Sequence, residues 1–343
     1  MKYPKSLPKG RTIGFPAPSF GCATQPYKAG FEHALEKWES MGYKTLPGPN
    51  SQVELGIGIS NSPEKCAREF MDMYLSKETD CLISCGGGEL MCEILPYLDF
   101  TRLAEGTPKW FMGYSDNTNL TFLLATFLDT ASIYGPCAAS FGMEPLHVSL
   151  KDAFEVLTGQ RTHLESYGMW EKDSVDDPEN PLAPYNLTEE LAMQCFAGRD
   201  AVSAAEFQGR LLGGCLDVLV NLVGTRFDRV AEFVDRYKED GIIWFLEACD
   251  LNVFSIRRAF WQLEEAGWFQ HVKGFLIGRP ANGEPMMNLD AKEAVLEVAG
   301  RKNVPVVMDV DIGHRPPMMP LVVGSMADVK FGGNHLTVDM RYC

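Results

Sequence analysis

Apolar and polar residues alternate in blocks over residues 11–140 of the chain. Short continuous apolar runs, such as 81–85 and 110–112, predict buried strands. The stretches between such runs carry apolar residues at helical spacing, as in 28–41 and 120–128, and predict amphipathic helices. Strands that alternate with helices favour a parallel sheet with helices on both faces. We therefore expect an N-terminal α/β domain of the Rossmann or flavodoxin type.

The pattern resumes at Glu206 and has a different character. Apolar runs at 242–246 and 272–280 predict further buried strands, and helical spacing returns between them. The tail alternates as hairpins do, with Gly332-Gly333-Asn334 as a turn between 327–331 and 336–340. These features predict a smaller, β-rich α+β domain at the C-terminal end.

The intervening stretch carries no clear helical or strand period. Its segment 170–181 is acidic and contains two prolines. A segment of this length is either a solvated connector or a loop that contacts a substrate. We expect three parts: a first domain over 1–165, a linker or loop near the site over 166–205, and a second domain over 206–343.

Charge and composition exclude several classes of partner. The chain has 343 residues, 45% of them hydrophobic and 22% charged, with a formal net charge of −15. Nucleic acid polymers and anionic membranes attract clustered Lys and Arg, which this sequence lacks. The apolar runs are too short to span a bilayer. Residues 1–10 lack the apolar core of a signal peptide, which predicts a cytoplasmic protein.

The ten cysteines are scattered along the chain. Cys81, Cys85 and Cys92 form a cluster, but no His or acidic residue joins it at zinc-site spacing. The sequence therefore predicts buried, reduced thiols, with no metal and no other cofactor.

A serine lies where an apolar run gives way to a helical pattern, in Gly113-Tyr114-Ser115-Asp116-Asn117. A sharp turn between strand and helix can present a serine hydroxyl as a nucleophile. Serine, aspartate and asparagine are also common helix caps, and the usual nucleophile elbow has a glycine where Asn117 stands. On this stretch alone a helix cap is the favoured interpretation.

A nucleophilic serine needs a base and a residue that orients the base. His314 follows a buried strand within a loop rich in glycine and proline. Glu247 ends a run of five apolar residues, where a carboxylate needs a partner. Asp217 and Asp250 are rivals for the orienting role, and Glu247 has the alternative role of capping the following helix.

Glycine-rich loops bring backbone N–H groups close to a ligand. Gly86-Gly87-Gly88 follows a predicted strand and suits either a phosphate or an oxyanion. A phosphate site would need a nearby Lys or a dinucleotide-binding spacing, and neither is present. The oxyanion interpretation fits better.

With these residues in place, the chain resembles the serine peptidase family of LD-carboxypeptidases and microcin C self-immunity peptidases over nearly its whole length. Each motif is weak alone, but their shared order is specific. The matching stretches are Ile13-Gly14-Phe15-Pro16-Ala17-Pro18-Ser19, Gly87-Gly88 with Leu95-Pro96-Tyr97-Leu98-Asp99, Gly113-Tyr114-Ser115-Asp116, Gly209-Arg210-Leu211-Leu212-Gly213-Gly214, Asn221-Leu222-Val223-Gly224-Thr225, Phe245-Leu246-Glu247, Gly278-Arg279-Pro280 and Asp311-Ile312-Gly313-His314.

The resemblance implies a role for each matched residue. Ser115 would be the nucleophile, His314 the general base and Glu247 the residue that orients the base. Backbone N–H groups of the Gly87-Gly88 pair and of Asp116 would form the oxyanion hole. The resemblance also implies a site between the two domains and a cytoplasmic homodimer.

Two positions depart from the family pattern. Glu89 stands where the family usually has an aromatic residue, and Cys249-Asp250-Leu251 stands where microcin-type members carry a Lys. Both departures bear on which substrate is bound more than on which reaction is catalysed. Glu89 is a candidate substrate contact for this reason, and so is Trp170, which resembles part of a substrate-contacting loop in microcin-type members.

The expected activity is LD-carboxypeptidase-like hydrolysis of an amide bond in a small peptide such as murein tetrapeptide. One alternative is hydrolysis of a microcin-type peptidyl-nucleotide. Two others remain: a non-catalytic peptide-binding protein on the same scaffold, and a glutamine-amidotransferase-like enzyme with Cys85 as nucleophile.

Overall fold

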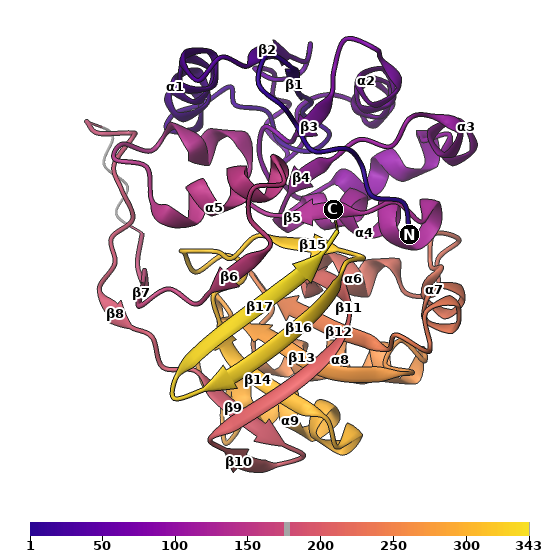
Figure 1. The fold of residues 1–343 in the computed structure, drawn as a ribbon, viewed down its shortest axis with the longest axis vertical. Coiled ribbons are helices and arrows are strands. Elements are labelled where there is room, and N and C mark those ends of the chain that lie inside the picture. Colours follow the sequence, from indigo (N-terminus) through magenta and orange to yellow (C-terminus); the bar gives the residue numbers. More distant parts are fainter. Residues whose placement is uncertain (175–178, 343) are drawn as a thin grey trace. The chain divides into compact units, whose positions relative to one another are not determined.

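The computed structural model describes residues 1–174 and 179–342 and divides into two compact units (Figure 1). The first unit comprises residues 1–161 and the described part of 173–186. The second comprises residues 162–172 and 187–342. Among the described residues, no helix combines the length and the apolar character that a membrane span requires.

The first unit contains a parallel sheet whose strands stand in the order β5-β4-β3-β1-β2. This arrangement confirms the predicted parallel α/β domain. The strands are β1 (Thr12–Phe15), β2 (Lys44–Pro47), β3 (Cys81–Ile83), β4 (Phe111–Gly113) and β5 (Ser132–Tyr134).

Helices connect these strands and supply much of the apolar core. Phe31 and Trp38 of the first helix pack on Phe15 of β1, with ring centroids 5.6 and 5.0 Å apart. The α-helices are α1 (Tyr27–Ser40), α2 (Pro63–Leu75), α3 (Phe100–Glu105), α4 (Thr118–Leu128) and α5 (Val148–Leu157). Three 3-10 helices are η1 (Met91–Tyr97), η2 (Ser115–Asn117) and η3 (Ala138–Gly142).

The second unit is built on a mixed sheet in the order β10-β9-β14-β13-β12-β11-β16-β17-β6. Its centre, β11 to β14, is parallel, and its flanking strands are antiparallel. The strands are β6 (His163–Glu165), β9 (Gln194–Ala197), β10 (Asp200–Val202), β11 (Ala204–Cys215), β12 (Ile242–Glu247), β13 (Val272–Gly278), β14 (Pro305–Val310), β16 (Met326–Gly332) and β17 (His335–Arg341).

The remaining elements of this unit are a small second sheet, one further strand and the helices. β7 (Met169–Trp170) and β8 (Glu189–Glu190) form a two-stranded sheet, and β15 (Leu321–Val323) lies between β14 and β16 in the chain. The helices are α6 (Leu216–Leu222), α7 (Val230–Arg236), α8 (Val253–Glu265), α9 (Ala291–Ala299) and the 3-10 helix η4 (Gly300–Lys302).

The structure differs from the sequence prediction over 166–205, where it contains strands β7 to β10. These strands have two to four residues, too few to show a period in the sequence. β9 is held by pairing with β14, more than a hundred residues away along the chain. β6 pairs with β17 and so belongs to the second compact unit. Residues 175–178 of the predicted acidic loop lie outside the described residues.

Two glycines lie inside a strand of the second unit: Gly213 and Gly214 are both part of β11. A Cβ atom added to Gly213 would lie 1.7 Å from the carbonyl oxygen of Phe245 in β12. These glycines therefore serve a close approach of two strands.

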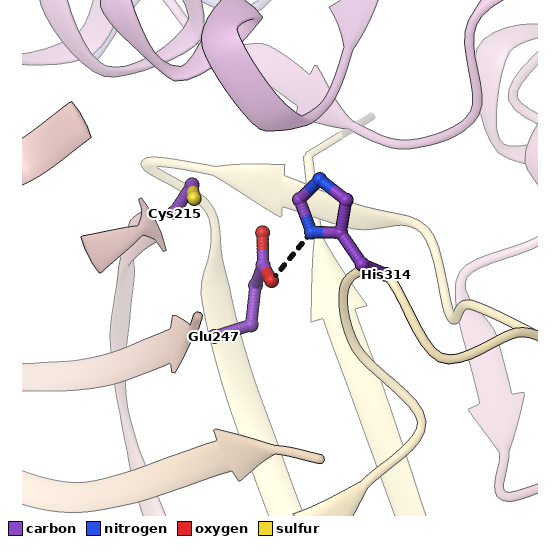
Figure 2. A group of neighbouring side chains, drawn as sticks. All are labelled: Cys215, Glu247 and His314. Carbon is purple, nitrogen blue, oxygen red and sulfur yellow. Dashed lines mark hydrogen bonds and ion pairs between the residues drawn. The ribbon is translucent and has the colours of Figure 1, made fainter. Parts of the chain in front are cut away.

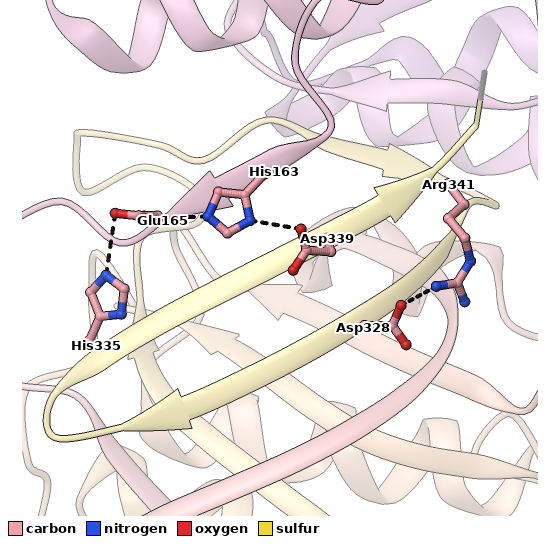
Figure 3. A network of polar contacts seen from close by, with 6 residues as sticks. All are labelled: His163, Glu165, Asp328, His335, Asp339 and Arg341. Atoms are coloured by element: carbon pink, nitrogen blue, oxygen red, sulfur yellow. Dashed lines mark hydrogen bonds and ion pairs between the residues drawn. The ribbon is translucent and has the colours of Figure 1, made fainter.

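The antiparallel strands at one edge of the second sheet carry charged pairs (Figure 3). His163 of β6 contacts Asp339 of β17 at 2.7 Å and Glu165 at 3.1 Å. Hydrogen bonds to Asp339 and Glu165 raise the pKa of His163. On the neighbouring strand pair, Arg341 donates to Asp328.

Substitution of Gly213 tests the close approach of β11 and β12. Gly213→Ala should lower the free energy of unfolding by about 3 kcal/mol or more, because the added methyl group overlaps a backbone oxygen and forces the strands apart. Chemical denaturation measures the loss. Gly224→Ala is the control: its φ is also positive, at +72°, but nothing lies within 4 Å of the added atom, so about 1 kcal/mol is expected. Equal losses for the two variants would contradict the argument.

The His163 contacts predict a pH-dependent contribution to stability. Because the folded-state pKa of His163 is raised, its contribution is fully present below about pH 6.5 and is lost as the pH rises through the raised value. His163→Gln should therefore lower the melting temperature at about pH 5.5 and change it little at about pH 9. Arg341→Gln removes an ion pair without a histidine and should have nearly the same effect at both pH values. A His163→Gln effect that is independent of pH would refute this.

Candidate active site

Ser115 stands at a sharp turn between strand β4 and helix α4. Its φ is +62°, a conformation that non-glycine residues adopt rarely. Its backbone N–H donates to the hydroxyl of Tyr134 at 3.3 Å. Gly113 is required before the turn, because a Cβ atom there would lie 2.8 Å from the side chain of Asn117. This geometry has the features of a nucleophile elbow, although its sequence lacks the second glycine.

The glycine loop after β3 lies beside this turn. A Cβ atom added to Gly87 would lie 3.3 Å from Cβ and 3.4 Å from Oγ of Ser115. The side chain of Asn117 donates to the carbonyl of Gly86 at 2.8 Å. Asn117, which departs from the usual elbow pattern, thus ties the turn to the glycine loop.

Asp116 is a buried carboxylate that joins three segments of the first unit. It accepts hydrogen bonds from the hydroxyl of Ser19, from the backbone N–H of Met91 at 2.8 Å and from Asn119 at 3.0 Å. Burial raises the pKa of Asp116, and these hydrogen bonds oppose the rise. The side chain therefore holds the glycine loop, the first-strand loop and the serine turn in one arrangement.

Gly88 completes the close packing of these loops. Its φ is +144°, and a Cβ atom there would lie 2.1 Å from Oγ of Ser19 and 2.6 Å from the carbonyl oxygen of Gly58. The neighbouring Glu89 is exposed and donates its backbone N–H to the same carbonyl at 3.0 Å. A side chain at Gly88 would push these loops apart.

In the second unit, Glu247 and His314 form a buried hydrogen-bonded pair. Nδ1 of His314 lies 2.8 Å from Oε2 of Glu247, and the side chain of Glu247 has no exposed surface (Figure 2). Two glycines leave room for the carboxylate. A Cβ atom at Gly278 would lie 2.9 Å from Cβ of Glu247, and one at Gly313, with φ +94°, would lie 2.4 Å from Oε2.

The pair sets the protonation behaviour of the imidazole. Burial acts to lower the pKa of His314, but the charge and hydrogen bond of Glu247 together with the thiol of Cys249 outweigh it, so this pKa lies well above its ordinary value. An imidazolium is therefore well stabilised at this position.

The rival roles named from the sequence can now be compared. The carboxylate of Asp217 accepts the backbone N–H groups of Cys249, Asp250 and Leu251, at 2.9 to 3.2 Å, and so stabilises the loop after β12. The cap of helix α8 is Asn252, whose side chain accepts from the N–H of Ser255. Glu247 is thus bonded to the histidine and is not the cap of that helix.

A second buried ion pair supports the loop that carries His314. Arg279 donates to the carboxylate of Asp311 and, at 2.6 Å, to the carbonyl of Asp309. The other oxygen of Asp311 accepts the backbone N–H of Tyr167 at 2.7 Å. The guanidinium also lies over the ring of Trp170, 5.0 Å from its centroid. Arg279 and Asp311 lie in two of the stretches that carry the family resemblance, but a charged residue at a strand end carries no signal of its partner, so their pairing was not predictable from the sequence.

The remaining predicted residues have structural contacts. The indole N–H of Trp170 donates to the carbonyl of Glu190 within the β7–β8 pair at 3.2 Å, which is the contact of a loop anchor. Cys85, the alternative nucleophile, is completely buried, and burial raises its pKa well above the ordinary value. A buried thiol with a raised pKa is a poor nucleophile.

The cysteines agree with the prediction of reduced thiols in the described part of the chain. Those described are free, and Cys92 and Cys249 are the two that are not buried. Cys343 lies outside the described residues. Cys215 was missed as a neighbour of the site, although it ends β11 opposite Glu247 on β12. Burial raises the pKa of the Cys215 thiol, and the charges of Glu247 and Asp217 raise it further.

Sequence comparison identifies both halves of the chain. The family model of the LD-carboxypeptidase N-terminal domain matches residues 13–135, and that of the LD-carboxypeptidase C-terminal domain matches residues 208–329. The chain belongs to the LD-carboxypeptidase family. The resemblance noted from its motifs is thereby confirmed, and so is its class as a peptidase-like protein.

Named relatives in this family differ in function. The microcin self-immunity protein MccF of Escherichia coli is 26% identical over 344 residues, covering 98% of this chain and 95% of that protein. A protein of Bacillus subtilis named "probable murein peptide carboxypeptidase" is 25% identical, covering 94% and 90%. The solved structure of MccF in complex with aspartyl sulfamoyl adenosine matches with a TM-score of 0.81 at 23% identity, covering 100% of this chain and 99% of that chain. The fold is therefore that of this LD-carboxypeptidase family.

The hydrogen bonds of Asp116 predict the effect of its substitution. Asp116→Asn should lower the free energy of unfolding by about 1–3 kcal/mol, because an amide cannot accept every hydrogen bond that the buried carboxylate accepts. Denaturant titration followed by circular dichroism measures the change. Asp235→Asn is the matched control: this carboxylate is exposed on α7 and pairs with Lys238, so the change should stay within about 0.5 kcal/mol. A loss no larger than that of the control would show that Asp116 does not join the loops.

Proposed function

We propose that this chain is a serine peptidase that hydrolyses an amide bond in a small peptide through Ser115, His314 and Glu247. The observation that carries the proposal is the buried hydrogen bond between Nδ1 of His314 and Oε2 of Glu247. It commits Nδ1 and leaves Nε2 as the ring nitrogen to take a proton from a nucleophile. The other part of the proposed triad is Ser115, whose strained backbone lies beside the glycine loop.

The mechanism follows from these contacts. His314 takes the hydroxyl proton as Oγ of Ser115 attacks the substrate carbonyl, and Glu247 stabilises the imidazolium that forms. The backbone N–H groups of Gly87, Gly88 and Asp116 are the proposed donors to the oxyanion. Each such donor contributes about 3–4 kcal/mol to the stability of the transition state in comparable sites. Water then hydrolyses the acyl-enzyme, with His314 as the base again.

Two substrate classes follow from the family. The first is a murein tetrapeptide, which an LD-carboxypeptidase would cleave at its terminal amide bond. The position of Cys249 favours this class, because microcin-type members carry a Lys in that part of the chain. The second is a peptidyl-nucleotide, which is favoured by the match with MccF over almost the whole chain and with its complex with aspartyl sulfamoyl adenosine. Glu89 and Trp170 are the proposed substrate contacts, and the homodimer and the cytoplasmic location stay predictions.

Removal of the nucleophile tests the proposal. Ser115→Ala should reduce turnover of the cleaved substrate on the order of 10⁴-fold or more, because no other group supplies the attacking oxygen. The two substrate classes are assayed side by side, with circular dichroism to show that the variant is folded. Ser40→Ala, at the exposed end of α1, is the control and should keep full activity. Near-normal turnover by Ser115→Ala would refute the triad.

A non-catalytic binding protein on the same scaffold gives a different result. A fluorophosphonate probe should label Ser115 of the unmodified chain and leave Ser115→Ala unlabelled. Binding of a peptide without labelling and without hydrolysis would favour the binding protein.

A further inference from the structure

Three different metal-ligating side chains converge in the second unit. Cys215 ends β11, Glu247 ends β12 in register with it, and His314 lies in the loop after β14. One donor atom from each, a thiol sulfur, a carboxylate oxygen and an imidazole nitrogen, lie within 4.8 Å of one another. Figure 2 shows the carboxylate of Glu247 between the thiol and the ring.

The donor set has a specific chemical preference. Sulfur, nitrogen and oxygen donors together suit Zn²⁺, which binds thiolates at about 2.3 Å and nitrogen or oxygen at about 2.0 Å. Tetrahedral bonds of that length place the donors roughly 3.3–3.8 Å apart, which small side-chain rotations reach from the observed spacing. Hard cations such as Mg²⁺ and Ca²⁺ prefer oxygen and would not select a thiol.

The three donors differ in their access to solvent. The side chain of His314 is 15% exposed, whereas those of Glu247 and Cys215 are buried. A cation can therefore reach the cluster from the side of the histidine and meet the buried donors behind it.

We infer that Cys215, Glu247 and His314 form an inhibitory site for a thiophilic divalent cation, with Zn²⁺ as the preferred ion. On binding, the thiol proton of Cys215 and the proton that Nδ1 of His314 shares with Glu247 pass to the solvent, the metal takes their place, and Nε2 of the ring carries the remaining proton. No oxidant or reductant takes part. The inhibitory role rests on the proposed function, because a metal-bound His314 cannot accept a proton from Ser115. Metal binding itself does not depend on the proposed function.

The first measurement is direct binding of Zn²⁺ to the untagged, reduced full-length chain. Calorimetric titration with zinc chloride should give one ion per chain. Titration with Co²⁺ should produce the near-ultraviolet absorption of a cobalt–thiolate bond, which requires a cysteine ligand. Absence of both signals would overturn the inference.

Variants then assign the ligands. Cys215→Ser should weaken the affinity for Zn²⁺ by more than the roughly 10–100-fold that loss of an outer-shell partner costs. Cys195→Ser is the matched control, because Cys195 is another buried cysteine of this unit, on β9, and should change nothing. Unchanged affinity in Cys215→Ser would refute the site.

If Cys215→Ser fails to fold, two other measurements still test the metal site. The cobalt absorption is measured on the unmodified chain, and His314→Gln provides a second ligand change, which should also weaken binding more than 10-fold. Inhibition is a separate arm: Zn²⁺ should abolish hydrolysis, and EDTA should restore it. Tight binding without inhibition would remove the inhibitory role. If Zn²⁺ binds but the Ser115→Ala variant still hydrolyses the substrate, the triad is refuted and the metal site is not.

Discussion

A carboxylate buried at the end of an apolar strand requires a partner, and the second unit meets this constraint at Glu247. The strand β12 is buried along its whole length, so Glu247 has no access to water. His314 supplies the compensating hydrogen bond, and Gly278 and Gly313 leave the space that the carboxylate occupies. The two glycines and the histidine loop thus accommodate one buried charge.

The first unit meets a similar constraint with Asp116. Its carboxylate is buried one residue after Ser115, and it gathers donors from the first-strand loop and from the segment after the glycine loop. A buried group whose hydrogen bonds are satisfied is rigid, because breaking any one bond leaves a polar atom unpaired. In each unit, therefore, a buried carboxylate fixes the position of the residue proposed to do the chemistry. The family supplies the roles, and the burial explains how they are held.

Much of the fold was predictable, because strands such as β3, β4 and β12 are continuous apolar runs and the helices between them show a clear period. Strands β7 to β10 were not, because their stability comes from partners distant in the sequence. The same distinction holds for the site. Glu247 and His314 were predictable from a charged residue at the end of an apolar strand and a histidine in a rigid loop. The Arg279–Asp311 pair and the place of Cys215 depend on which strands become neighbours, and periodicity does not carry that information.

The surroundings of the histidine explain why membership in the family does not decide the substrate. The loop that follows β12 is held through its backbone by Asp217, so its side chains do not hold the buried pair in place. Here two thiols, Cys215 and Cys249, lie close to an imidazole. A Lys near this position would bring a fixed positive charge, whereas a thiol brings a weak hydrogen-bond donor and an affinity for soft metals. The same buried pair therefore has a different chemistry around it.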